Sequence, residues 1–94
     1  MAKRIKVSVR FGDRVYNAAV ERDERADQLL LRSLYHFGIA PEEKGDYRLA
    51  YEGEERTDRG VYLDHPIGDQ VQDGGRLILQ EDVAGNRRPS TGSY

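Results

Sequence analysis

The chain has no cysteine, and its 94 residues include only two histidines and three prolines. Without cysteine it can form neither a disulfide framework nor a thiolate nucleophile. Two scattered histidines cannot assemble a metal site by themselves. Redox and metal chemistry are therefore excluded, and we expect no metal and no cofactor.

Long hydrophobic runs and a dominant charge sign are also lacking. No apolar run approaches the roughly 20 residues of a membrane span, and the start MAKRIKVSV has no signal-peptide hydrophobic region. We therefore expect a cytoplasmic protein with no membrane partner. The net charge is −2 with acids and bases mixed throughout, so there is no basic stripe for phosphates and nucleic acid is not an expected partner.

What is present suits one small, very soluble domain. Charged residues make up 34% of the chain and hydrophobic residues 37%. A chain of this length buries only about 60% of the surface that its unfolded form exposes. These values predict a modest core under a densely charged surface.

The first twenty residues predict a hairpin. RIKVSVRF, residues 4–11, alternates apolar and polar residues, as a strand with one buried face does. Gly12-Asp13 supplies a turn, and VYNAAVE follows. The residues expected on the buried face are Ile5, Val7, Val9, Phe11, Tyr16, Ala18 and Val20.

A helix is predicted next. Asp23 can cap it through its carboxylate, and Glu24 complements the positive end of the helix dipole. Gly38 can end the helix in the left-handed conformation, with Pro41 just beyond. The apolar stripe expected to pack on the hairpin consists of Ala26, Leu30, Ser33, Leu34 and Phe37.

The second half predicts two more strands. YRLAY, residues 47–51, alternates again, with Arg48 and Ala50 pointing away from the core. RLILQ forms a last strand with Ile78 pointing outward. Between them lies a polar, turn-rich segment whose expected anchors, around a short helical turn, are Val61, Leu63, Ile67 and Val71.

The predicted fold is α+β, a mixed sheet of four or five strands packed on one helix. We expect the folded domain to span residues 1–82. Residues 83–94 have the Gly, Asn, Pro, Ser and Thr composition of a flexible tail.

Three segments carry a resemblance to a known family. HFGIAPEE has glycine, isoleucine and proline at a helix exit, DYRLAYEGEE has a strand and turn, and LDHPIGDQVQDGGRLIL leads into the last strand. In this order and spacing they resemble the ubiquitin family, whose fold is the β-grasp. The arginine-rich, cysteine-free character is most similar to the ubiquitin-like modifiers of bacterial ubiquitination-type operons.

The resemblance implies chemistry at the C-terminus. Gly85 lies about where the family's terminal glycines lie, Ala84 replaces the penultimate one, and nine residues follow. This is similar to a modifier precursor that a deubiquitinase-like metallopeptidase would cut between Gly85 and Asn86. An activating enzyme would then adenylate the Gly85 carboxylate, and a conjugating enzyme would join it to an amine of a target protein through an isopeptide bond. The alternative is that Gly85 simply begins a floppy terminus.

The resemblance also implies a partner-binding surface. Ala50 and Ile78 match the centre of the family's apolar patch, and Arg48 and Arg76 flank them. Because Ala50 is smaller than the isoleucine that the family uses, dedicated partners are favoured over ordinary ubiquitin readers.

Two other functions stay open alongside the modifier. One is a non-covalent interaction module that keeps its tail, and the other is a sulfur carrier, which Ala84 and the tail disfavour. We do not expect an enzyme, because no nucleophile, base and orienting group occur together.

Overall fold

The computed structural model of the chain describes residues 4–56 and 59–81. Within these ranges the elements are β1 (Arg4–Phe11), β2 (Arg14–Glu21), α1 (Ala26–Phe37), the 3-10 helix η1 (Pro41–Asp46), β3 (Tyr47–Tyr51), the 3-10 helix η2 (Ile67–Asp69) and β4 (Gly75–Glu81). The strands, α1 and the turn at η2 follow in the predicted order, and η1 was not predicted. No helix in the described ranges is long and apolar enough to span a membrane. Residues 83–94, predicted as a tail, lie outside them, so that domain boundary stays a prediction.

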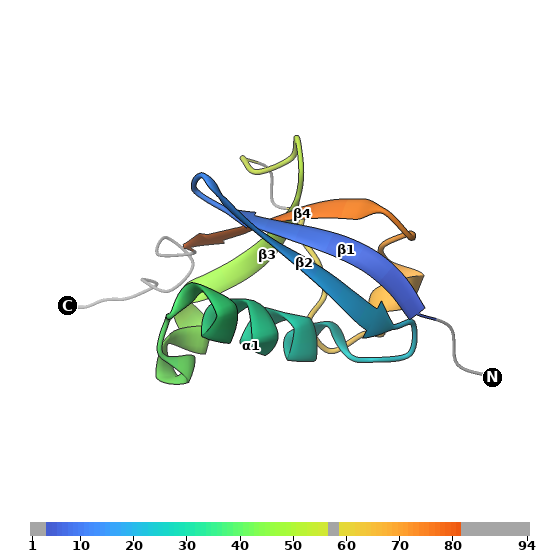
Figure 1. Cartoon of the computed structure of the whole chain (residues 1–94), viewed down its shortest axis with the longest axis horizontal. Helices are drawn as coiled ribbons and strands as arrows, with labels where there is room; N and C mark the ends of the chain where they lie inside the picture. The colour runs from blue at the N-terminus through green and yellow to red at the C-terminus, as the bar shows by residue number, and fades with distance from the viewer. Residues whose placement is uncertain (1–3, 57–58, 82–94) are drawn as a thin grey trace.

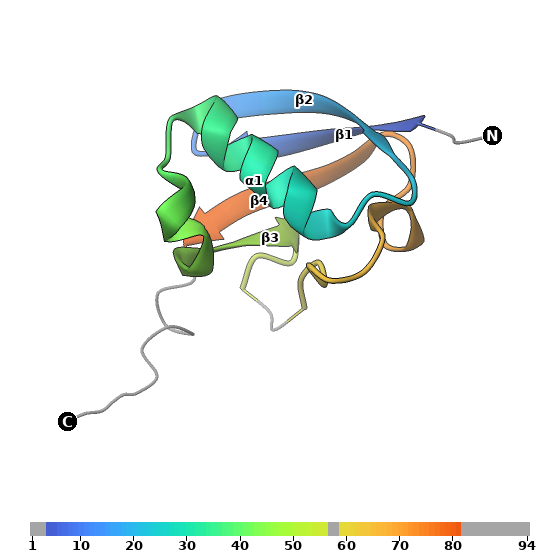
Figure 2. The same cartoon turned by 90° about the horizontal axis from the view of Figure 1, so that it is seen from below.

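The strands form one mixed sheet with the order β2-β1-β4-β3. The two central strands, β1 and β4, are parallel, and each edge strand is antiparallel to its neighbour. Helix α1 lies across one face of this sheet (Figures 1 and 2). The α+β prediction is confirmed, with four strands in the described residues. We call the face away from α1 the outer face.

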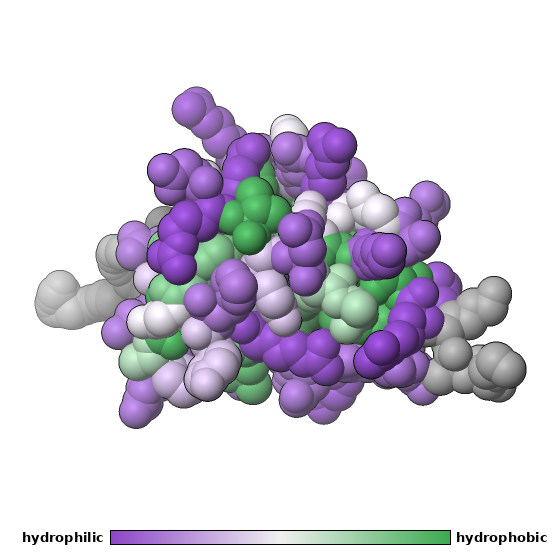
Figure 3. All heavy atoms as spheres, viewed as in Figure 1, coloured by the Kyte–Doolittle hydropathy of each residue, from purple (hydrophilic) through white to green (hydrophobic). Residues whose placement is uncertain are grey.

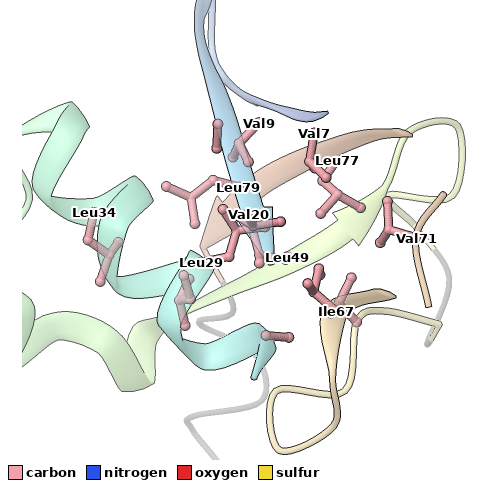
Figure 4. Packing of buried hydrophobic residues seen from close by; sticks show 14 of the residues in the cluster. Val7, Val9, Val20, Leu29, Leu34, Leu49, Ile67, Val71, Leu77 and Leu79 are labelled. Atoms are coloured by element: carbon pink, nitrogen blue, oxygen red, sulfur yellow. The ribbon is translucent and has the colours of Figure 1, made fainter. Parts of the chain in front are cut away.

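The core lies between α1 and the inner face of the sheet. Alternation along β1 buries Ile5, Val7 and Val9 as predicted, and Phe11 packs partly buried against the core. Side chains from the strands, from α1 and from η2 point toward a common centre (Figure 4). The residues with no measurable exposure in this cluster are Val9, Ala26, Leu29, Leu30, Leu34, Leu49 and Ile67.

The start of α1 differs from the sequence prediction. The helix begins at Ala26 with Arg25 as its N-cap, and Arg25 makes no side-chain capping bond, so the cap predicted at Asp23 is wrong. The first amides of a helix need acceptors from outside it. Here the Ala26 and Asp27 N–H groups donate to backbone carbonyls of the loop at residues 63–65, at 3.0 and 2.9 Å. Because this loop supplies the acceptors, no capping carboxylate is needed.

The end of α1 follows the sequence prediction. Gly38 has φ 77°, in the left-handed region that glycine adopts without strain. The Ile39 N–H donates to the Leu34 carbonyl at 2.8 Å, which satisfies one of the free carbonyls of the last turn.

The segment between β3 and β4 is irregular and well anchored. Val61, Ile67 and Val71 are buried, and Leu63 packs partly buried against the core, so all four predicted anchors are confirmed. Two further backbone bonds of 2.8 Å join this segment to the loop before α1, from the Ile67 N–H to the Glu24 carbonyl and from the Gly68 N–H to the Arg22 carbonyl.

Gly68 provides a test of this anchoring. A Cβ at residue 68 would lie 2.6 Å from Arg22 Cβ and 2.8 Å from the Arg22 carbonyl oxygen, so the backbone would have to move apart. We expect Gly68→Ala to lower the free energy of unfolding by about 2 kcal/mol, as overpacking does. Urea denaturation measures the change.

Gly45→Ala is the matched control, because a Cβ at residue 45 meets nothing within 4 Å. It should change the free energy of unfolding by no more than about 0.5 kcal/mol. Equal stability of the two variants would contradict the close packing of Gly68 on Arg22.

Candidate functional site

The sheet pairing brings the predicted binding residues together on the outer face. Ala50 of β3 pairs with Ile78 of β4, and Ile78 pairs with Arg10 of β1. Arg10 pairs in turn with Val15 of β2, so these four residues form one row across the sheet. Because side chains alternate along strands, Arg48 and Arg76 occupy the same face as this row.

The apolar members of this row are largely covered. Ala50 has no exposed surface and Ile78 is 8% exposed, although neither belongs to the core under α1. Neighbouring charged and polar side chains therefore close over them. The structure offers a partner little apolar area at Ala50 and Ile78, and their predicted role in binding stays a prediction.

Ion pairs bridge the strands beside Ile78. The Arg10 guanidinium lies 3.6 Å from a Glu52 carboxylate oxygen and 3.9 Å from one of Glu55. Arg76 reaches the other Glu52 oxygen at 3.6 Å. We call Arg10, Glu52, Glu55 and Arg76 the arginine–glutamate cluster. It presents both signs of charge, so it is suited to recognising polar partner surfaces.

Arg48 is held against its own fold. Its Nε donates to Gln80 Oε1 at 3.1 Å, and its Nη2 donates to the Arg59 carbonyl at 3.4 Å. Of the two predicted flanking arginines, Arg76 is the more available to a partner, because its side chain is 73% exposed.

Arg10, Glu52 and Glu55 were not among the predicted site residues. Alternation along residues 4–11 could have placed Arg10 on the outer face. Glu52 continues the pairing of β3 with β4, because its N–H donates to the Arg76 carbonyl at 3.2 Å, so the alternation of β3 places it on the outer face as well. Glu55 depends on the turn after β3, where Gly53 has φ 91° and the Glu54 N–H donates to the Tyr51 carbonyl at 2.9 Å. No local sequence pattern shows that this turn bends back over the outer face.

The predicted conjugation site follows β4. The strand ends at Glu81, which pairs with Tyr47 of β3. Ala84, Gly85 and Asn86 lie outside the described residues.

Burial raises the pKa of Tyr47, and the negative charge of Glu81 raises it further.

The described residues contain no cluster of three or more His, Asp or Glu side chains that could hold a metal ion. The outer face has guanidinium, carboxylate and amide groups, which suit recognition by ion pairs and hydrogen bonds.

Known structures share this architecture. The ubiquitin-like (UBL) domain of Plasmodium falciparum Dsk2 aligns with a TM-score of 0.66 and 21% identity over 85% of this chain and all of that one. A designed protein based on ubiquitin aligns with a TM-score of 0.65 and 18% identity over 96% of each chain. A structure described as molecular mimicry of SUMO aligns with a TM-score of 0.67 and 16% identity, over 83% of this chain and 91% of that one.

The chain has a ubiquitin-like β-grasp fold. No protein-family model and no curated protein sequence matches it. At 16 to 21% identity the three structures establish the fold alone. In this ubiquitin-like fold, β4 lies in the middle of the sheet and ends at Glu81.

The arginine–glutamate cluster predicts a small, salt-sensitive coupling. Arg10 and Glu52 side chains are 45% and 38% exposed, and exposed ion pairs contribute up to about 1 kcal/mol. A double-mutant cycle with Arg10→Ala and Glu52→Gln should give a coupling of about 0.5 kcal/mol in the free energy of unfolding. The coupling should shrink as salt rises to about 1 M.

The control cycle pairs Arg10→Ala with Glu42→Gln, since Glu42 lies in η1 and forms no ion pair with Arg10. It should give no coupling. A coupling between Arg10 and Glu52 that high salt leaves unchanged would contradict an electrostatic origin.

Tyr47 predicts a loss of stability at alkaline pH. Its pKa is raised above the ordinary 10.0, so its contribution to stability is complete below pH 10 and is lost as pH rises through the raised pKa. Tyr47→Phe should make the free energy of unfolding fall less steeply above about pH 10. Ultraviolet titration of Glu81→Gln should show a lower Tyr47 pKa than the wild type, and an unchanged pKa would exclude Glu81 as a cause.

Proposed function

We propose that the chain is the precursor of a ubiquitin-like protein modifier that is conjugated through Gly85. The observation that carries this proposal is the position of Gly85 in a ubiquitin-like fold, four residues after the last residue of β4. Four residues reach about 13 Å when fully extended, so the reacting carboxylate could lie up to that distance from the folded domain when an enzyme binds it.

The first step is hydrolysis of the Gly85–Asn86 peptide bond by a deubiquitinase-like metallopeptidase, which consumes water and releases nine residues. Peptidases grip an extended segment before the bond they cut. The small side chain of Ala84 and the lack of one at Gly85 suit a narrow channel. The product is a chain that ends in the Gly85 carboxylate.

The later steps follow acyl-transfer chemistry. The Gly85 carboxylate attacks the α-phosphate of ATP on a ubiquitin-activating-like enzyme, and pyrophosphate leaves. A cysteine of that enzyme displaces AMP to form a thioester, which passes to a ubiquitin-conjugating-like enzyme. A target lysine amine then displaces the thiolate and forms the isopeptide bond. In this proposal all catalytic groups belong to partner enzymes of the cytoplasm, and the chain itself catalyses no step.

A non-covalent interaction module is the second candidate. The likeness to the UBL domain of Dsk2 favours it, since 85% of this chain aligns with the whole of that domain. The arginine–glutamate cluster would then supply the binding surface, with Arg76 as its most exposed member. The two candidates differ in the fate of the tail, which only the modifier loses.

The test is the intact mass of the protein recovered from its native host. Wild-type chain should have the mass of residues ending at Gly85, together with heavier covalent adducts. Gly85→Glu should keep all 94 residues and form no adducts, because a side chain at residue 85 blocks both enzymes.

Gly92→Glu is the matched control, since it makes the same change within the released segment. It should be trimmed and conjugated as the wild type is. Wild-type protein of full-length mass with no adducts would overturn the modifier and leave the interaction module.

A further inference from the structure

The two borders of the sheet differ. At the β3 border, the Val61 N–H donates to the Leu49 carbonyl at 2.9 Å, so a segment of the chain covers the edge. Strand β2 forms the other border, and no strand of the described residues pairs with its outer edge (Figure 2). An open strand edge is a template for pairing with another strand.

The hydrogen bonds of Lys6 fix which backbone groups of β2 are open. The Lys6 N–H donates to Asp73 Oδ1 at 2.8 Å, and its carbonyl accepts from the Gly74 N–H at 2.7 Å. Lys6 therefore exchanges no bonds with Ala19, its partner on β2. Such pairs alternate along an antiparallel ladder. Every second residue of β2, from Val15 through Ala19, thus directs its N–H and carbonyl to the open edge.

The middle of this edge carries no charge. Residues Val15–Val20 read VYNAAV, in a chain of which 34% is charged. Natural edge strands are commonly protected from pairing by charged side chains. Asp13 and Arg14 precede this stretch, and Glu21 and Arg22 follow it. Each end has one charge of each sign, so residues 13–22 carry no net charge.

We propose that β2 is an interface between two copies of this chain. The strands pair antiparallel about a two-fold axis at Asn17, which joins two four-stranded sheets into one of eight strands. In this register Asn17 faces Asn17 of the second copy, Val15 faces Ala19, and Tyr16 faces Ala18. Residues that face one another then share a face of the sheet, as pairing requires.

The outer face of the edge is self-complementary in this register. Val15 projects an apolar side chain that is 50% exposed. Ala19, which faces it in the second copy, is small and borders a shallow hollow lined by Lys6, Ser8, Asn17, Gly74 and Gly75. A two-fold axis makes this contact twice, as an isologous interface does.

The helix side of the edge is complementary as well. A second hollow, between β2 and α1, is lined by Tyr16, Leu31, Arg32, Tyr35 and His36. Both α1 helices lie on the same face of the joined sheet, so Tyr35, which is 85% exposed, turns toward the other copy. In the dimer Arg32 would lose its long 3.4 Å hydrogen bond to the Ala19 carbonyl, which would instead accept from the Val15 N–H of the second copy.

The face of the molecule seen in Figure 3 is largely hydrophilic, with small, separate hydrophobic areas.

The test uses charge at the two-fold axis and the whole chain. Sedimentation velocity over a concentration series should show wild-type protein in a monomer–dimer equilibrium. Asn17→Glu and Asn17→Lys each place two like charges face to face, and each should weaken the dimer about tenfold. An equimolar mixture of the two variants should dimerise again, since opposite charges then meet across the axis.

Gln72→Glu is the matched control, because it adds the same charge at an exposed residue that lines neither hollow. It should dimerise as the wild type does. Wild-type protein that stays monomeric up to about 1 mM overturns the proposal, since a dissociation constant above that value is too weak for a specific dimer. So does a mixture that fails to recover, which would leave the edge to an extended segment of another protein. Neither result bears on Gly85, so this test is independent of the proposed function.

Discussion

Four backbone hydrogen bonds hold residues 63–68 against the loop and first turn at residues 22–27, and the rest of the fold depends on them. They satisfy the first amides of α1, which has no side-chain cap. They also seat Ile67 in the core and direct the chain into β4 beside β1. A parallel pair needs a long crossover, and this anchored segment lets β4 enter the middle of the sheet in a fixed register.

Local patterns predicted the elements well where burial on one face decides the structure. Alternation along residues 4–11 and 47–51 placed both strands, because a one-residue slip would turn the core side chains to solvent. The start of α1 was mispredicted because Asp23 satisfies the local capping rule, whereas the acceptors used come from residues nearly forty positions later. Tertiary contacts of that kind leave no trace in a local sequence window.

The candidate site divides in the same way. Gly85 is proposed from sequence alone, because the proposed chemistry asks only for a small residue a few positions beyond the last strand. The outer face could be predicted only in part, since alternation gives the direction of Ala50 and Ile78 but not their exposure. Glu52 follows from the same alternation, whereas Glu55 reaches Arg10 only because the chain turns at Gly53, and that turn has no local sequence signal.

The charged outer face of the sheet differs from the uncharged edge strand β2 in the contacts that it can make. Where ion pairs cover β1, β3 and β4, the apolar residues beneath are closed off, and contacts there must be polar and salt-sensitive. At β2 the charges stop for six residues, and backbone groups and small side chains are left open. Because β1 separates β2 from β4, a second copy paired with β2 would not lie directly beside β4. The proposed pairing of copies and the proposed reaction at Gly85 therefore involve different strands of the sheet.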